Sequence, residues 1–207
     1  MTDRIIRKEV ISVMAKSKPE STTEIVVLSV RQPWAAALLE AGKWCECRTW
    51  RYPTKYRGPL FIHSSSSWAA RPHPDIMAGE PWMKKLWDSP SPLASITGAI
   101  IGRVDVVHAA DEHDTEECYR ILAKQSRRVP TPTQVALMPF LPPVDDSVER
   151  KDDPWRWWGS GGVIVCRNPV VLNEPISTGG KLNLWRFAVD PERLVFREKK
   201  PSKRKKR

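Results

Sequence analysis

The hydrophobic pattern changes its period within one short stretch, VRQPWAAALLEAGKWCECRTW at 30–50. Apolar residues first recur at helical spacing, at Trp34, Ala37, Leu38 and Ala41. Pro33 suits the first position of a helix, and Gly42 suits the left-handed residue that ends one. The pattern therefore predicts a helix over 33–41.

The following residues, 43–50, alternate with a period of two and predict a strand. One face of this strand carries Trp44, Glu46, Arg48 and Trp50. The other face carries Cys45, Cys47 and Thr49, and we expect both cysteines to face the core. An ordinary amphipathic strand does not combine charge and aromatic surface on one face. We interpret the first face as a site.

Other apolar runs predict further strands at 25–30, 59–63, 98–107, 161–172 and 181–189. We expect serines 64–67 to end the second of these strands. The third is expected to be buried on both faces, and the fourth to be a strand pair bent at Asn168-Pro169. Short helices are predicted at 81–88 and 115–125.

Five to six short strands with few, short helices predict an α+β fold, a small mixed β-barrel with short flanking helices. At 207 residues the chain fits one domain, which we place at 25–190 after a flexible leader at 1–24. Two longer segments, 68–95 and 126–156, look like insertions. The second is long enough to be either functional or disordered.

The net charge of +10 comes mostly from one end of the chain. Residues 197–207 alone hold eight Lys or Arg and one Glu, whereas the part from 25 to 196 is close to neutral. We therefore predict a basic disordered tail over 191–207 that adds nonspecific affinity for polyanions. Its basic residues are Lys199, Lys200, Lys203, Arg204, Lys205, Lys206 and Arg207.

The four cysteines do not form a metal-binding pattern, because no C-x-x-C is present and no histidine lies at zinc-finger spacing. We expect reduced thiols, no metal and no cofactor. No secretory signal and no apolar run long enough to span a membrane is present. We expect a cytoplasmic location, or a nuclear one in a eukaryote, where KKPSKRKKR would also serve for nuclear import.

Three motifs in order, S-V-x-Q-P-W-A, G-K-x-x-E-x-R-T-W and Y-R-G-P-L-x-I-H, resemble the ASCH domain, the activating-signal-cointegrator homology family of PUA-like folds. They fall on Ser29, Gln32, Pro33, Trp34, Gly42, Lys43, Glu46, Arg48, Trp50, Arg57, Gly58, Ile62 and His63. A less specific match continues through N-P-x-x-L at 168–172 and G-K-L-x-L-W at 180–185. The resemblance implies a PUA-like β-barrel with a cleft beside the helix N-terminus, proposed for the family to bind RNA or modified nucleotides.

The residues themselves suit such a ligand. Open N–H groups at the start of helix 33–41 form an anion site. Lys43, Glu46 and Arg48 offer donors and acceptors for a base edge, and tryptophans offer stacking faces. The candidate binding residues are Arg31, Gln32, Pro33, Trp34, Lys43, Glu46, Arg48, Trp50, His63 and Ser64.

Each residue also has a purely structural interpretation. Trp34 can be a core residue, Glu46 and Arg48 can simply pair with one another, and Lys43 can serve only the helix dipole. His63 can be a satisfied structural histidine.

The favoured function is RNA or other nucleic-acid binding by a monomer. Some members of this family are amidohydrolases that act on acylated nucleosides, and they resemble this chain at Lys43 but have Thr where it has Glu46. Pairing with Glu46 would raise the pKa of Lys43 and keep the amine protonated, which argues against that mechanism. A metal-independent hydrolase or ribonuclease using Lys43, Glu46 or His63 remains the alternative. A third possibility is a regulatory adaptor that binds a protein partner through 126–156.

Overall fold

The structure is a computed structural model. It describes residues 21–48, 50, 53, 55–74, 81–110 and 162–198. The predicted helix at 115–125, the insertion at 126–156, the basic residues from 199 onward and most of the leader lie outside the described residues.

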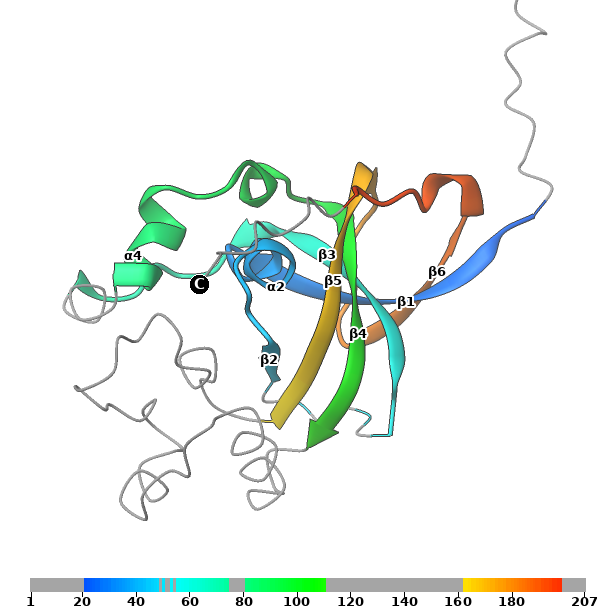
Figure 1. The fold of residues 1–207 in the computed structure, drawn as a ribbon, viewed down its shortest axis with the longest axis horizontal. Coiled ribbons are helices and arrows are strands. Elements are labelled where there is room, and N and C mark those ends of the chain that lie inside the picture. Colours follow the sequence, from blue (N-terminus) through cyan, green and yellow to red (C-terminus); the bar gives the residue numbers. More distant parts are fainter. Residues whose placement is uncertain are drawn as a thin grey trace, which may run out of the picture.

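Six strands form one mixed sheet in the order β2-β5-β4-β3-β1-β6 (Figure 1). They are β1 (Thr23–Gln32), β2 (Cys45–Arg48), β3 (Gly58–Trp68), β4 (Ala99–Ala110), β5 (Gly162–Ser177) and β6 (Leu184–Val189). Strands β1 and β3 pair in parallel, and every other neighbouring pair is antiparallel. The predicted α+β class and the number of strands are confirmed.

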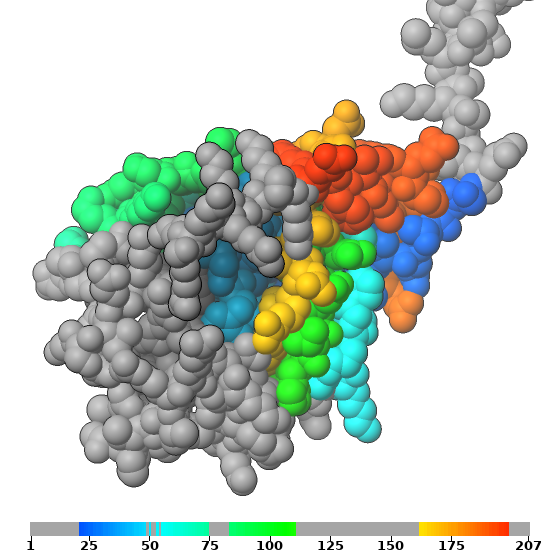
Figure 2. All heavy atoms as spheres, viewed as in Figure 1, coloured from blue at the N-terminus to red at the C-terminus, as the bar shows by residue number. Residues whose placement is uncertain are grey.

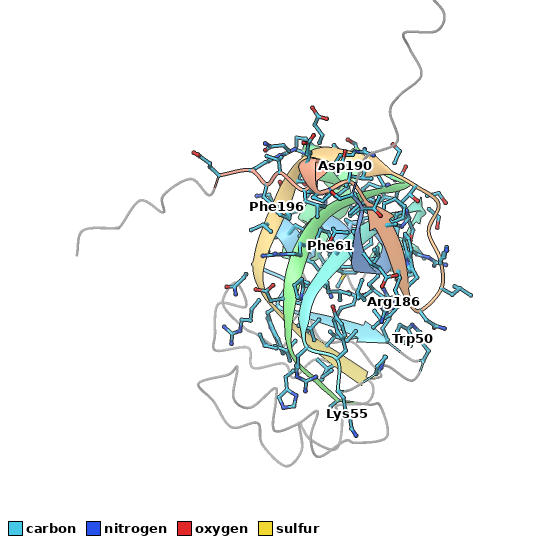
Figure 3. All side chains as sticks on the ribbon, turned by 90° about the vertical axis from the view of Figure 1, so that its right-hand side faces the viewer. Trp50, Lys55, Phe61, Arg186, Asp190 and Phe196 are labelled. Carbon is cyan, nitrogen blue, oxygen red and sulfur yellow. The ribbon has the colours of Figure 1, made fainter. Side chains whose placement is uncertain are left out.

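The predicted closure into a barrel is wrong for the described strands. The sheet curves strongly (Figure 3), but its edge strands β2 and β6 do not pair with each other. The ladder between β1 and β6 ends at Leu28 and Leu184. At the next residue along β1, the Ser29 carbonyl accepts a hydrogen bond from the Arg48 side chain of β2. A side chain rather than a strand ladder thus connects β2 to β1.

Helix α2 (Trp34–Glu40) lies against this sheet (Figure 1). It begins one residue later than predicted, because Pro33 is its N-cap, and Gly42 follows it with the expected positive φ of 74°. The prediction of a single apolar face is wrong, because five consecutive residues, 35–39, are buried and Ala41 is exposed. In Figure 2 the blue atoms of this part of the chain are set back beside the yellow atoms of β5, which agrees with this burial, and the green region at the upper left holds helix α4 (Pro81–Asp88).

A glycine lets the helix approach the sheet closely. A Cβ atom at Gly102 in β4 would lie 2.6 Å from Leu39 Cδ1 and 2.5 Å from the Val170 carbonyl oxygen. Leu39 therefore packs directly onto the backbone of β4. Small side chains on α2 serve the same end, since three of its five buried residues are alanines.

The core has a layer on each face of the sheet. Leu60 and Ile62 of β3 pack on the side of α2, whereas Phe61 between them packs on the opposite side. This alternation is the period of two expected of a strand buried on both faces. The 3-10 helix η1 (Pro92–Ser95) contributes Leu93 to the α2 side.

The C-terminal segment after β6 covers the opposite side. It contains the 3-10 helix η4 (Pro191–Arg193), and its Phe196 forms a bridge with Leu172 and a ring contact with Phe61, with centroids 6.4 Å apart (Figure 3). The fold therefore extends beyond the predicted boundary at residue 190. Residues 191–198 belong to the packed structure and not to a disordered tail.

Other predicted strand limits also change. Strand β3 continues through serines 64–67 to Trp68, and β2 is shorter than the predicted 43–50. Strand β4 is not buried on both faces throughout, because Val107 bulges out and is 46% exposed. The predicted pair at 161–172 is one long strand with an irregularity at Asn168, whose φ is 49°.

Helix α4 matches the prediction at 81–88. In the described part of the chain, no helix is long and apolar enough to cross a membrane.

Candidate functional site

A cleft of about 880 Å³ opens beside β1, β2 and β3 and is bordered by the loop 178–183 between β5 and β6. Six of the ten predicted binding residues line it, namely Arg31, Trp34, Glu46, Arg48, Trp50 and His63. The other four do not line it and are buried, namely Gln32, Pro33, Lys43 and Ser64. The structure thus divides the ten predicted binding residues into two groups. Six belong to the lining of the cleft, which we call its wall, and four are buried and do not belong to it.

A buried charge network forms part of the wall. The Glu46 carboxylate, only 6% exposed as a residue, has Oε2 2.7 Å from Lys43 Nζ and Oε1 3.0 Å from Arg48 Nη2. Two cations share one anion, so the network carries a net positive charge. Arg48 is its most exposed member, with 22% of its side chain accessible.

Lys43 is fully engaged behind the wall. Its ammonium donates hydrogen bonds to the Glu46 carboxylate and to the Cys45 carbonyl. Burial is the largest single effect on the pKa of Lys43 and lowers it, but the charge and hydrogen bond of the Glu46 carboxylate, together with the nearby Cys45 and Cys47, raise the pKa above its ordinary value. The amine is therefore protonated at neutral pH and has no lone pair to act as a base.

Arg48 lines the cleft with a side chain that is partly accessible. Its Nη2 donates to the Ser29 carbonyl at 2.8 Å and is paired with Glu46, which fixes the orientation of the guanidinium plane. Its Nε is buried without a hydrogen-bond partner and does not reach the cleft surface. The accessible part of the guanidinium can donate to a ligand in the cleft.

Gln32 and Ser64 do not face the cleft but fasten the η1 turn to the sheet. Gln32 Nε2 donates to the carbonyls of Leu93 and Ile96 at 3.1 and 3.0 Å, and the Ser64 hydroxyl donates to the Ile96 carbonyl at 2.7 Å. Gln32 Oε1 accepts from the Ala36 N–H at 3.1 Å. One N–H group of the anion site predicted at the start of the helix is therefore already occupied by a side chain of the protein.

His63 is 1% exposed and is held by the loop that borders the cleft. Its Nε2 donates to the Thr178 carbonyl at 3.0 Å, which leaves Nδ1 as an acceptor without a partner. Burial lowers the pKa of His63, against the opposing effect of the Thr178 carbonyl, so the neutral imidazole is favoured. Gly180 packs against the ring so closely that an added Cβ would lie 2.6 Å from Cε1.

Three tryptophans were candidate stacking faces. Trp34 and Trp50 line the cleft and also pack against the core, as the structural interpretation of Trp34 expects. The ring of Trp34 meets Trp87 of α4 edge to face, with centroids 5.1 Å apart. Trp44 packs against the core and does not line the cleft.

The described cysteines are free thiols. Cys45 is buried as predicted, but Cys47 is half-buried and lines the cleft. Burial raises the pKa of Cys45 and raises that of Cys166 to about 12, so both are thiols rather than thiolates at neutral pH. Among the residues that the structure describes, no group of three or more His, Cys, Asp or Glu could hold a metal ion.

Sequence reasoning missed two parts of the wall. The residues are Ser65, Ser66 and Ser67 of β3 together with Thr178, Gly179, Gly180, Lys181, Leu182 and Asn183 of the loop. Taken alone, the serine run predicts a strand end, whereas β3 continues through it to Trp68. The G-K-L-x-L-W motif at 180–185 was a signal for the loop.

Comparisons with known proteins match this chain to one family. A family model described as the ASCH domain matches residues 28–142. The structure is similar to that of an ASCH protein from Zymomonas mobilis, with 12% sequence identity, 81% of this chain and 89% of that chain covered, and a TM-score of 0.39. A single-residue mutant of that protein matches with 12% identity, 81% and 91% coverage and the same TM-score. No curated protein sequence matches this chain. Because the family model matches more than half of the sequence, the chain belongs to the ASCH domain family.

Proposed function

We propose that this protein binds single-stranded nucleic acid, RNA first, and holds a nucleotide in the cleft beside Arg48. Membership in the ASCH family supports this proposal, because binding of RNA or modified nucleotides is what has been proposed for that family. The single observation that carries it is the Arg48 guanidinium, which lines the cleft, is 22% accessible and is held in orientation by Glu46 and the Ser29 carbonyl.

The charge of the wall suits an anionic or acceptor-rich ligand. Arg31, Arg48 and Lys181 oppose a single carboxylate, Glu46, so the charged lining residues sum to +2. Lys43 adds a further positive charge directly behind the wall. A guanidinium can donate to a phosphate or to the acceptors of a base edge, and both bonds are charge-assisted.

The aromatic part of the wall suits a base. Trp50 and Trp34 line the same cleft as Arg48, so a π-face and a guanidinium are available to one ligand. Single-stranded bases are typically recognised in this way, by stacking together with hydrogen bonds to their edges. The cleft volume falls within the range of about 300–1,000 Å³ that small-ligand sites occupy. A base with its sugar and phosphate fits that range.

The geometry gives less support to hydrolysis by Lys43. The ammonium lies behind the wall, donates to two protein acceptors and has a raised pKa. A general base needs a free lone pair and access to the substrate, and the Lys43 amine has neither of these. The adaptor alternative rests on 126–156, which lies outside the described residues.

The proposal is tested by titrating a fluorescently labelled single-stranded RNA of mixed sequence with the full chain and with an Arg48→Gln variant. We expect the variant to bind about tenfold more weakly, because it loses a charge-assisted hydrogen bond to the ligand. Arg31→Gln is a second variant that leaves buried contacts intact, since Arg31 is exposed. It should weaken binding and reduce its salt dependence.

Matched controls separate the cleft from the tail. Arg193→Gln changes an exposed arginine of η4, outside the cleft, and should leave the affinity unchanged. A chain that ends at residue 198 lacks the basic residues 199–207 and should lose only affinity that is sensitive to salt. If that truncation abolishes all binding while Arg48→Gln and Arg31→Gln have no effect, the cleft is not the binding site.

A further inference from the structure

The loop 178–183 places an apolar side chain at the border of the charged cleft. Leu182 is 90% exposed, the highest value among the exposed large hydrophobic residues of the described chain, and it lines the cleft. Its neighbour Lys181 is also exposed and also lines the cleft. An apolar tip and an ammonium therefore occur side by side where a ligand would enter.

This loop is held in place before and after Leu182. Before it, the Thr178 carbonyl accepts from His63 Nε2 at 3.0 Å, the Thr178 N–H donates to the Gly98 carbonyl at 3.1 Å, and the Lys181 carbonyl accepts from the Ser29 hydroxyl at 2.9 Å. After it, β6 begins at Leu184, which pairs with Leu28 of β1. The backbone is therefore anchored on both sides of the exposed leucine.

The backbone conformation after Leu182 adds to this constraint. Asn183 has a φ of 59°, in the left-handed region, so the chain turns sharply between the exposed leucine and the first residue of β6. The Lys181 ammonium lies 5.8 Å from the centre of the Trp185 ring, which keeps its stem along the sheet. These features together hold the leucine out toward solvent.

An isolated exposed leucine on a protein surface needs no explanation. Leu182 differs from the exposed Val107 and Val195 because it lines the cleft, whereas those two residues do not. An apolar side chain beside basic groups suits a nucleic acid strand, in which apolar base faces and phosphates alternate. A lone nucleotide that stacked on Trp50 would leave this second apolar surface unused.

We propose that Leu182 packs against the base next to the one held in the cleft, so that the ligand is a single strand of at least two nucleotides and not a free nucleotide. Lys181 would then lie near the phosphate that joins the two. This inference rests on the proposed function, because it extends the same site along the strand. Loop 178–183 would then be the element by which the protein discriminates a nucleic acid strand from a free nucleotide.

The experiment compares two probes on the full chain. One is a fluorescently labelled single-stranded RNA of mixed sequence, and the other is the set of free nucleoside monophosphates, measured by calorimetry. Leu182→Ser should weaken RNA binding about fivefold or more, because the apolar contact is lost. The same variant should leave the affinity for nucleoside monophosphates unchanged. Every variant keeps the basic tail, so differences between variants come from the substituted residue.

Two further variants make each result decisive. Val195→Ser removes an exposed apolar side chain outside the cleft and should bind RNA like the wild-type protein. Arg48→Gln should weaken the binding of both probes. If Arg48→Gln weakens both and Leu182→Ser changes neither, the inference about Leu182 is wrong and the proposed function stands. If the wild-type protein binds neither probe, or if Arg48→Gln changes neither affinity, the proposed function fails as well.

Discussion

Lys43 and Glu46 form a buried ion pair, with 2.7 Å between Nζ and Oε2. The pair places the carboxylate so that its second oxygen contacts Arg48 at the surface of the cleft. Glu46 thereby ties a buried cation to an accessible one. Removal of Glu46 would leave the Lys43 ammonium buried without a compensating charge, which is far more costly than loss of an exposed ion pair.

The first prediction concerns Glu46→Gln. The substitution keeps the shape of the side chain but removes the charge that compensates Lys43, so the free energy of unfolding should fall by about 3 kcal/mol or more. For a chain of this size that corresponds to a melting temperature lower by roughly 6–12 °C. Thermal unfolding followed by circular dichroism measures it. The matched control is Glu40→Gln, at the exposed end of α2, which should leave the melting temperature unchanged.

The ion pair also predicts a stability effect at alkaline pH. The pKa of Lys43 is raised in the folded state, so its contribution to stability is complete below the ordinary lysine pKa of 10.5 and is lost as the pH rises through the folded value. Lys43→Met should remove this part of the alkaline pH dependence of the urea midpoint. Equal alkaline profiles for the variant and the wild-type protein would contradict the assignment of the pair.

His63 predicts a loss of stability at acidic pH, whereas Lys43 predicts one at alkaline pH. Burial lowers the pKa of His63 in the folded state, so the unfolded chain binds a proton more readily as the pH falls below 6.5. The folded state therefore loses stability as the pH falls below 6.5 toward the lower pKa of the folded state. His63→Gln should flatten this part of the curve of urea midpoint against pH.

Two neighbouring glycines give a paired prediction for the loop. Gly180→Ala would place a Cβ 2.6 Å from Cε1 of the buried His63 ring and 3.0 Å from the Ser29 hydroxyl, so the loop or the ring must move. We expect a destabilisation of about 1–3 kcal/mol. Gly179→Ala meets nothing within 4 Å and should be neutral or slightly stabilising. Chemical denaturation measures both, and the NMR signal of the His63 ring should shift only in the first. Equal stabilities would show that the loop does not pack on His63.

The local sequence pattern predicted those elements whose conformation depends mainly on their own residues. Helix α2 and its end at Gly42 follow from spacing and from the freedom of glycine at positive φ. The charged strand face also led to Glu46 and Arg48, which line the cleft. The role of Gln32 could not be predicted, because its hydrogen-bond partners Leu93 and Ile96 lie more than sixty residues away in sequence.

The remaining differences arise from long-range pairing. Polar serines favour a strand end when judged alone, yet Ser64 pairs with Val30 of β1 and the ladder carries the strand onward. Loop 178–183 reaches the cleft because β6 pairs with β1 and returns it beside Ser29. Neither relationship is visible in the period of the sequence. The motif at 180–185 marked the loop as characteristic of the family without indicating what it contacts.

The position of bound RNA tests the central claim most directly. Ultraviolet crosslinking of a single-stranded RNA to the full chain, followed by mass spectrometry of the digested protein, identifies the residues that the bases touch. The account predicts crosslinked nucleotides on peptides that contain Trp50 and Leu182, and their loss in the Arg48→Gln variant. Crosslinks confined to the basic residues from 199 onward, unaffected by Arg48→Gln, would contradict it.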